Sequence, residues 1–284
     1  MDGYQNGGVS SQQLRIAICG TANRLTERTR DTGLRGLHDV VRECMEDACE
    51  ATRPQGEDDY VGIFVGFSEK DTEKQGSGET EPINCLAREL GIQGPSIAIM
   101  SEFSSGLIAL HEACYAISMG MATSAIVACA EPPLLTASVE QDAISVLYLK
   151  PLHAARRDGN PVCAVIRAAE TDYYSSFHEA ELPTQRMYET LIRRAYEKAG
   201  LDPGHTITVQ KTVAPSTAVA EPEKLALQSV FGLERITTDQ QKDQPAIGIG
   251  MAGLFKAIDW LIRNTPSQNL NGKRTRYDPQ SLWY

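Results

Sequence analysis

The apolar residues of this chain fall into short continuous runs that alternate with longer stretches of helical spacing. The short runs are typical of buried strands. They lie at residues 15–19, 60–66, 96–100, 124–129, 143–150, 162–169 and 206–210. Apolar positions three and four residues apart predict amphipathic helices at 33–53, 83–90, 104–117, 183–199, 221–231 and 250–263. Strands and helices alternate in two similar rounds, which predicts an α/β fold with layered sheets.

Polar stretches separate these elements. We expect loops at 20–32, 68–80, 171–181 and 235–244, and a turn at 158–160 between two strands of the second round. The glycines at 248–253 spell GxGxxG before a helix. A dinucleotide site would need this motif to open a strand–helix–strand unit with an acid some 20 residues on. A polar tail follows instead, so we interpret these glycines as sites of close packing.

One stretch organises the pattern, because it joins the strand at 96–100 to a helix through a sharp turn at 101–103. Leu107, Leu110 and Cys114 lie on one face of this helix, and Ser104 and Ser105 are suited to cap its start. In a strand–turn–helix unit the turn lies at the positive end of the helix, where a nucleophile or an oxyanion is stabilised. Phe103 occupies that turn and has no nucleophilic atom.

Composition excludes several classes of function. The chain has 284 residues, 42% of them hydrophobic, and a formal net charge of −10. This charge argues against a nucleic-acid or anionic-membrane partner held by a general electrostatic field. No segment approaches the roughly 20 apolar residues of a membrane span, and the first residues lack the pattern of a signal peptide. We therefore expect no nucleic acid, no membrane and a cytoplasmic protein.

The cysteines and histidines indicate no metal or cofactor site. The seven cysteines are scattered, contain no CxxC pair and lie mostly within apolar segments. Free thiols in a reducing compartment explain such a pattern most simply. The five histidines show no spacing typical of metal ligands. We expect neither a metal nor a cofactor.

Several motifs in one order resemble the ketosynthase domain of fungal highly reducing polyketide synthases, a member of the thiolase-fold superfamily. They are RIAICGTANRL, LHDVVRECMEDACE, SSGLIALHEAC, AISVLYLKPLHAARRDGNPVCAVIRAA, LIRRAYEKAGLDP, EPEKLALQSVFG and GMAGLFKAI. The resemblance covers most of residues 15–264. It implies a thiolase-like α-β-α-β-α layered fold, here shortened because three loops that wall the acyl tunnel of the family are reduced.

The resemblance also implies that the family's catalytic Cys-His-His set is absent. Its nucleophilic cysteine falls on Phe103, its first histidine on Val213 in the segment VAPST, and its second histidine near Gln244. Without the thiol no acyl-enzyme forms. Without the two imidazoles, the hydrogen bonds that assist decarboxylation and stabilise the enolate are lost. Losing all three groups indicates a changed function.

The resemblance divides the chain into three parts. Residues 1–13 form a flexible N-terminal segment, residues 14–264 a ketosynthase-like domain, and residues 265–284 a polar tail. The halves of the domain lie at about 14–131 and 142–264. We expect no acyltransferase, reductase or carrier domain to follow, and any carrier protein to come from another chain.

Two hypotheses remain open. In the first, the chain is a non-condensing partner of itself or of a polyketide synthase, in a homo- or heterodimer paired through Ser96–Met100. In the second, it is a repurposed enzyme that cyclises, isomerises or releases a polyketide acyl intermediate, with Glu102 and Ser104 as catalytic residues. The residues expected to line a substrate are Phe103, Ser105, Val213, Ser216, Thr217 and Gln244. Capping of the helix start is the structural alternative for Glu102, Ser104 and Ser105.

Overall fold

The computed structural model describes residues 15–27, 32–50, 59–67, 81–101, 104–131, 141–172, 183–206, 209–210, 217–232, 236–237, 251–264, 268–270 and 273–275. A six-stranded mixed sheet forms its centre, with the order β3-β2-β4-β5-β1-β6. The bounds of these strands are Ser96–Met100 for β3, Val61–Phe67 for β2, Ser124–Glu131 for β4, Gln141–Pro151 for β5, Ile16–Glu27 for β1 and Ala164–Ile166 for β6. β2 pairs in parallel with β3 and β4, while β5 runs antiparallel to β4 and β1.

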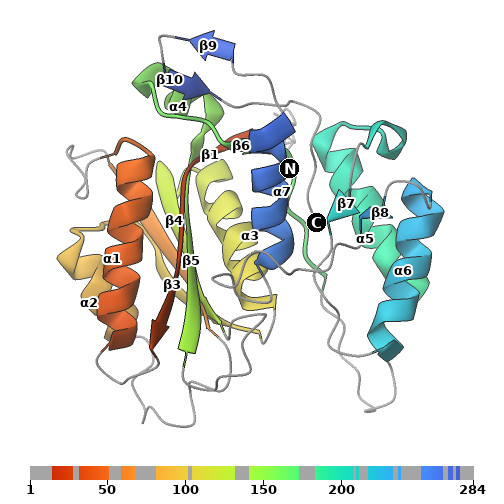
Figure 1. Cartoon of the computed structure of the whole chain (residues 1–284), viewed down its shortest axis with the longest axis horizontal. Coiled ribbons are helices and arrows are strands. Elements are labelled where there is room, and N and C mark those ends of the chain that lie inside the picture. The colour runs from red at the N-terminus through yellow and green to blue at the C-terminus, as the bar shows by residue number, and fades with distance from the viewer. Residues whose placement is uncertain are drawn as a thin grey trace, which may run out of the picture.

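Helices cover both faces of this sheet (Figure 1). On one face, α1 (Thr32–Asp47) and α2 (Glu81–Glu89) form a core with the sheet that includes Val40, Cys44 and Leu86. On the other face, α3 (Ser105–Ser118) and α7 (Ala252–Asn264) bury a second core. The continuous apolar runs of the central strands follow from this arrangement, because a sheet covered on both faces has no polar side.

A smaller layered unit lies beyond α7 (Figure 1). The two-residue strands β7 (Val209–Gln210) and β8 (Ile236–Thr237) pair in parallel, and β7 contacts α7. The helices α5 (Gln185–Ala199) and α6 (Thr217–Phe231) bury a third core with β7, in which Tyr196 stacks at a tilt on Phe231. The successive layers are therefore helices, sheet, helices, sheet and helices, which confirms the predicted α/β class.

Several predicted boundaries were wrong. Residues 20–27, predicted as a loop, extend β1, because they continue the antiparallel pairing with β5 up to Glu27 and Gln141. Between β5 and β6 the chain forms a short helix, α4 (Leu152–Asp158), rather than a turn, and it ends at Gly159 with a positive φ of 73°. Part of the loop expected at 235–244 forms β8. The polar tail contains a small hairpin of β9 (Gln268–Leu270) and β10 (Lys273–Thr275).

The predicted division of the domain runs through the large sheet. β4 ends at Glu131 and pairs with β5, which begins at Gln141 and was assigned to the second half. The halves at 14–131 and 142–264 stay a prediction, and residues 1–13 lie outside the described part of the chain. In the described residues, no helix is long and apolar enough to cross a bilayer.

Candidate functional site

The predicted strand and helix exist, with β3 at one edge of the large sheet and α3 behind it, while Glu102 and Phe103 between them lie outside the described residues. Ser104 is the N-cap residue of α3 and is exposed. Its backbone is helical, with φ −95° and ψ −6°, and its side chain accepts no hydrogen bond from the first turn. The expectation that Ser104 caps the helix with its hydroxyl was therefore wrong. A capping residue needs an extended backbone to aim its oxygen at the first-turn amides.

Ser105 fixes the helix start from below. Its side chain is fully buried, and its Oγ donates to the carbonyl oxygen of Phe67 at 2.7 Å. The same Oγ accepts from the amide of Ser101 at 2.8 Å. One hydroxyl thus joins the ends of β2 and β3 to the first turn of α3. Because a hydroxyl has one proton to donate, these contacts favour a structural role for Ser105 over the predicted contact with a substrate.

Two glycines let α3 approach the sheet closely. A Cβ built on Gly66 would lie 2.5 Å from the carbonyl carbon of Ser105. A Cβ on Gly106 would lie 2.7 Å from both Cys129 Sγ and Met251 Cγ. Met251 is fully buried and directly precedes α7. The starts of α3 and α7 therefore meet over the end of β4, and their positive ends face the same region.

Beneath these helix starts, three polar side chains form a row across the sheet. Cys129 of β4 lies opposite Ser145 of β5, which in turn lies opposite Asn23 of β1. Cys129 and Ser145 are buried, whereas Asn23 is exposed. The row could not be predicted from the sequence, since Cys129 and Ser145 stand inside apolar runs and Asn23 lies in a segment predicted as a loop. Only the register of three strands brings them together.

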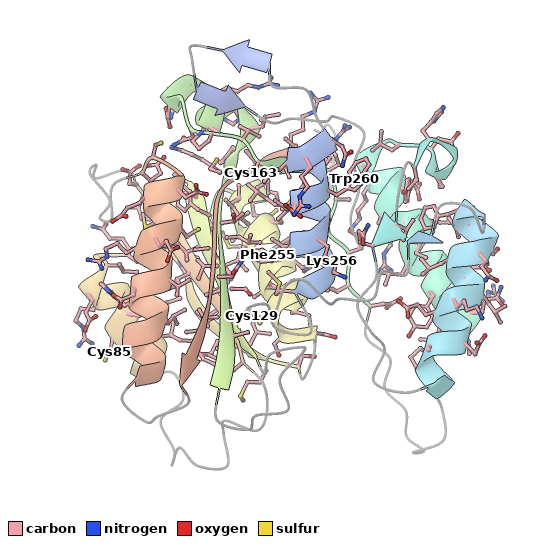
Figure 2. All side chains as sticks on the ribbon, viewed as in Figure 1. Cys85, Cys129, Cys163, Phe255, Lys256 and Trp260 are labelled. Carbon is pink, nitrogen blue, oxygen red and sulfur yellow. The ribbon has the colours of Figure 1, made fainter. Side chains whose placement is uncertain are left out.

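Three of the buried thiols are unsuited to act as nucleophiles. Burial raises the pKa of Cys19 and of Cys114 to about 12, and it raises the pKa of Cys44 further still. These thiols are protonated at neutral pH, and the thiolate is the reactive form. Cys85 lies on α2 at the outside of the molecule, and Cys129 lies in the core between the sheet and α3 (Figure 2).

The structure brings together only part of the predicted site. Ser104 and Ser105 lie at the start of α3 as expected. Thr217 is the first residue of α6, and the structure describes only its backbone. The other predicted residues lie outside the described part of the chain; they are Glu102, Phe103, Val213, Ser216 and Gln244. Across the described ranges, no group of His, Cys, Asp or Glu side chains has a geometry that would hold a metal ion.

The fold is that of known ketosynthases. The chain is similar to the oxazolomycin ketosynthase domain OzmH KS8 of Streptomyces albus JA3453, with a TM-score of 0.72 and 20% identity, over 95% of this chain and 88% of that one. It is also similar to the ketosynthase from module 6 of the bacillaene synthase of Bacillus subtilis 168. There the TM-score is 0.71 and the identity 17%, over 94% of this chain and 66% of that one.

Curated relatives agree with this fold. The chain is 30% identical over 264 residues to the highly reducing polyketide synthase g433 of a Fusarium species, covering 80% of this chain and 10% of the relative. It is 32% identical over 288 residues to the highly reducing polyketide synthase FUM1 of Gibberella moniliformis, covering 85% and 11%. The chain thus spans about a tenth of the length of the relatives it matches. Residues 20–160 match the family described as β-ketoacyl synthase, N-terminal domain. The chain therefore contains a ketosynthase-related domain, whose residues 20–160 are similar to the β-ketoacyl synthase N-terminal domain.

Proposed function

We propose that this chain is a non-condensing ketosynthase homologue that serves as a partner or auxiliary protein of a polyketide synthase. The observation that carries the proposal is the sequence between β3 and α3, Ser101–Ser104, which contains Phe103 and no cysteine. The first cysteine after β3 is Cys114, which lies deep in α3 and is buried. The link to polyketide synthesis comes from the relatives, which are highly reducing polyketide synthases.

The absent groups are those that condensation requires. Acyl transfer to an enzyme needs a nucleophile in its reactive form, next to a base or a positive helix end. By the resemblance, Phe103, Val213 and Gln244 stand where the thiol and the two imidazoles belong. A helix start can stabilise an oxyanion, but it cannot supply the thiol that attacks the acyl group and displaces the carrier thiol. The chain keeps the ketosynthase-like fold and lacks the thiol and the two imidazoles that condensation requires.

A partner surface is available at the edge of the sheet. β3 is an edge strand, and Ile97 and Met100 on it are 39% and 48% exposed. The helix α3 contacts β3; its Tyr115 is 50% exposed, and Met119, the C-cap residue after it, is 61% exposed. An apolar edge strand with free ladder positions is a hazard unless a partner covers it. We propose that it pairs with a second copy or with the matching strand of a polyketide synthase.

Light scattering on the purified chain tests this surface. We expect a dimer, or a complex with a synthase chain, that Ile97→Lys disrupts, because the charge would be buried at the interface. Leu225→Lys is the matched control, since Leu225 is 45% exposed on the distant helix α6. A monomer with no partner bound, or equal effects of the two variants, would count against the proposal.

One observation keeps an enzymatic function as a second candidate. Ser104 is exposed and its side chain makes no capping hydrogen bond, and a positive helix end is a favourable place for an anionic or partly negative ligand group. Glu102 is the ionisable residue of the turn, and a positioned acid or base typically contributes about a hundred- to ten-thousand-fold. Such a contribution suits an intramolecular cyclisation or double-bond shift.

Glu102→Gln separates the two candidates, because it removes the charge and keeps the size. Product formation by the polyketide synthase is measured in three reactions. One contains the wild-type chain, one contains the Glu102→Gln variant, and one contains neither. If product is lost in Glu102→Gln while folding and association are intact, the chain is an enzyme. If product survives Glu102→Gln and is lost in Ile97→Lys, the chain acts as a partner.

A further inference from the structure

Large apolar side chains gather on the surface where α3 ends. Among the described residues, seven large hydrophobic side chains are exposed, and four of them lie at this end of the sheet: Tyr60, Tyr115, Met119 and Met121. Their exposed fractions run from 48% to 61%. Exposed apolar side chains that cluster, unlike scattered ones, mark a site of interaction.

The turn after α3 fixes the backbone between the two methionines. Gly120 has a positive φ of 71°, and its amide donates to the carbonyl oxygen of Ile117 at 3.1 Å. The amide of Met121 donates to the carbonyl oxygen of Ala116 at 2.9 Å. This pattern is a Schellman motif, which ends a helix at a glycine. A Cβ built on Gly120 would meet no atom within 4 Å, so the space beside this turn is open.

Tyr60 lies next to the same turn. The amide of Thr123 donates to the carbonyl oxygen of Tyr60 at 2.8 Å. Phe64 of β2 belongs to the core under α3, and side chains alternate along an extended chain, so Tyr60 and Gly62 share the face of Phe64. A Cβ built on Gly62 would lie 3.5 Å from the Cβ of Ala122. Tyr60 therefore lies on the face that α3 covers, beside the end of this helix.

Tyr115 completes the cluster, because it lies one helical turn before Met119 on α3. We call Tyr60, Tyr115, Met119 and Met121 the methionine–tyrosine surface. Its methionine side chains are flexible and adapt to apolar groups of different shapes. Its tyrosine rings combine a large apolar contact area with an affinity for cations.

The charge around this surface is negative. The strands β2, β3 and β4 run parallel, so their starts lie side by side at this end of the sheet. The segments 59–62, 91–96 and 115–123 contain one charged residue, the exposed Asp59. The end of α3 adds the partial negative charge of the helix dipole. A cationic partner is therefore favoured over an anionic one, and over a second copy with the same negative surface.

We propose that the methionine–tyrosine surface binds a basic amphipathic helix of a partner protein. A partner strand is added at the edge of a sheet, where the ladder groups are free, and not at the starts of its strands. A helix offers apolar side chains three and four residues apart, with lysine or arginine beside them. This inference rests on the proposed function, because Tyr115 and Met119 belong to the partner surface described above, and it names the element that this surface takes.

Fluorescence anisotropy with a labelled model peptide tests the surface. The peptide has about 15 residues, enough to form a helix, with leucine and lysine placed so that one face is apolar. We expect saturable binding to the wild-type chain. A peptide of the same composition in scrambled order should not bind, and neither should a version with glutamate in place of lysine. No saturation with the first peptide, or equal binding of all three, would overturn the proposal.

Variants of Met121 locate the contact. Met121→Lys should weaken binding about tenfold, because it removes a buried apolar contact and adds a like charge. Met121→Leu keeps an apolar side chain of similar volume and should bind as the wild-type chain does. Leu225→Lys is the matched control on α6 and should change nothing. Equal losses in Met121→Lys and Leu225→Lys, or co-sedimentation of the chain with phosphatidylglycerol vesicles, would refute the assignment.

One further variant separates this inference from the pairing through β3. Ile97→Lys should disrupt the dimer or synthase complex and leave peptide binding unchanged. A complex that persists in a chain unable to bind the peptide would refute the methionine–tyrosine surface alone. Peptide binding by a chain that forms no complex would support this surface and refute the pairing alone.

Discussion

The helices α3 and α5 start in different ways, and the difference separates architecture from function. At α5, Thr184 has an extended backbone and its side chain accepts from the amide of Met187. At α3, Ser104 is helical and provides no cap, while Ser105 and Gly66 fix the helix from beneath. In α5 the N-cap side chain therefore accepts a hydrogen bond from an amide of the first turn. The second helix, α3, is positioned by the sheet, through the hydroxyl of Ser105 and the close approach at Gly66.

The close approach of α3 to β2 should show the largest effect on stability. Gly66→Ala places a Cβ 2.5 Å from the backbone of Ser105, and we expect a cost of about 3 kcal/mol, as for severe overpacking. Gly159→Ala is the control, because Gly159 has a φ of 73° with open space around it. Its cost should be about 1 kcal/mol from backbone strain alone. Equal midpoints in urea for the two variants would show that α3 is not held by close packing.

The second effect tests the anchor below α3. Ser105→Ala removes both hydrogen bonds of the hydroxyl and leaves two buried backbone groups without their partner. We expect a loss of about 2 kcal/mol in the free energy of unfolding. Urea denaturation followed by circular dichroism measures it. A loss below the uncertainty of the fit would mean that Ser105 does not position the helix.

The third effect contrasts the two caps directly. Thr184→Ala should cost about 1 kcal/mol, because it removes a working N-cap. Ser104→Ala should cost much less, since its hydroxyl makes no capping bond. The difference in denaturation midpoint between the two variants is the measured quantity. If Ser104→Ala is the more damaging variant, the start of α3 is capped after all and is not open.

The smallest effect concerns acid stability away from the helix starts. Hydrogen bonds from Arg157, and then from Lys150, lower the pKa of Asp158 from 3.8 to about 2. A lowered folded pKa contributes stability that is present above the unfolded pKa and is lost as the pH falls toward 2. Since Arg157 is 72% exposed, we expect less than about 1 kcal/mol. Asp158→Asn should therefore flatten the loss of stability between pH 4 and pH 2, and an unchanged slope would contradict this assignment.

The sequence predicted the scaffold better than the site. The strand Ser96–Met100 and the helix behind it were found as expected. The strand has a continuous apolar run, and the helix has apolar residues at helical spacing. The extension of β1 to Glu27 was missed, since residues 20–27 are polar and only pairing with β5 makes them a strand. Tertiary pairing overrides local preference in such edge segments.

The buried part of the candidate site could not be predicted from the pattern of apolar and polar residues in the sequence. Ser145 reads as one polar residue inside an apolar strand, and nothing local distinguishes it from Ser105, which is paired. Strand register and three-dimensional contacts decide which serine is an orphan. The absence of the reagents at Phe103, Val213 and Gln244 was inferred from the resemblance, and these residues lie outside the described part of the chain.

Incubation of the purified chain with acyl and malonyl carrier-protein thioesters tests the central claim most directly. Intact-mass spectrometry detects an acyl-enzyme, and product analysis detects chain extension. Because the turn before α3 has no thiol and three of the seven cysteines have raised pKa values, we predict an unchanged mass and no extended product. A stable acyl adduct on any cysteine, or a condensed product, would contradict the account and make the chain an active ketosynthase.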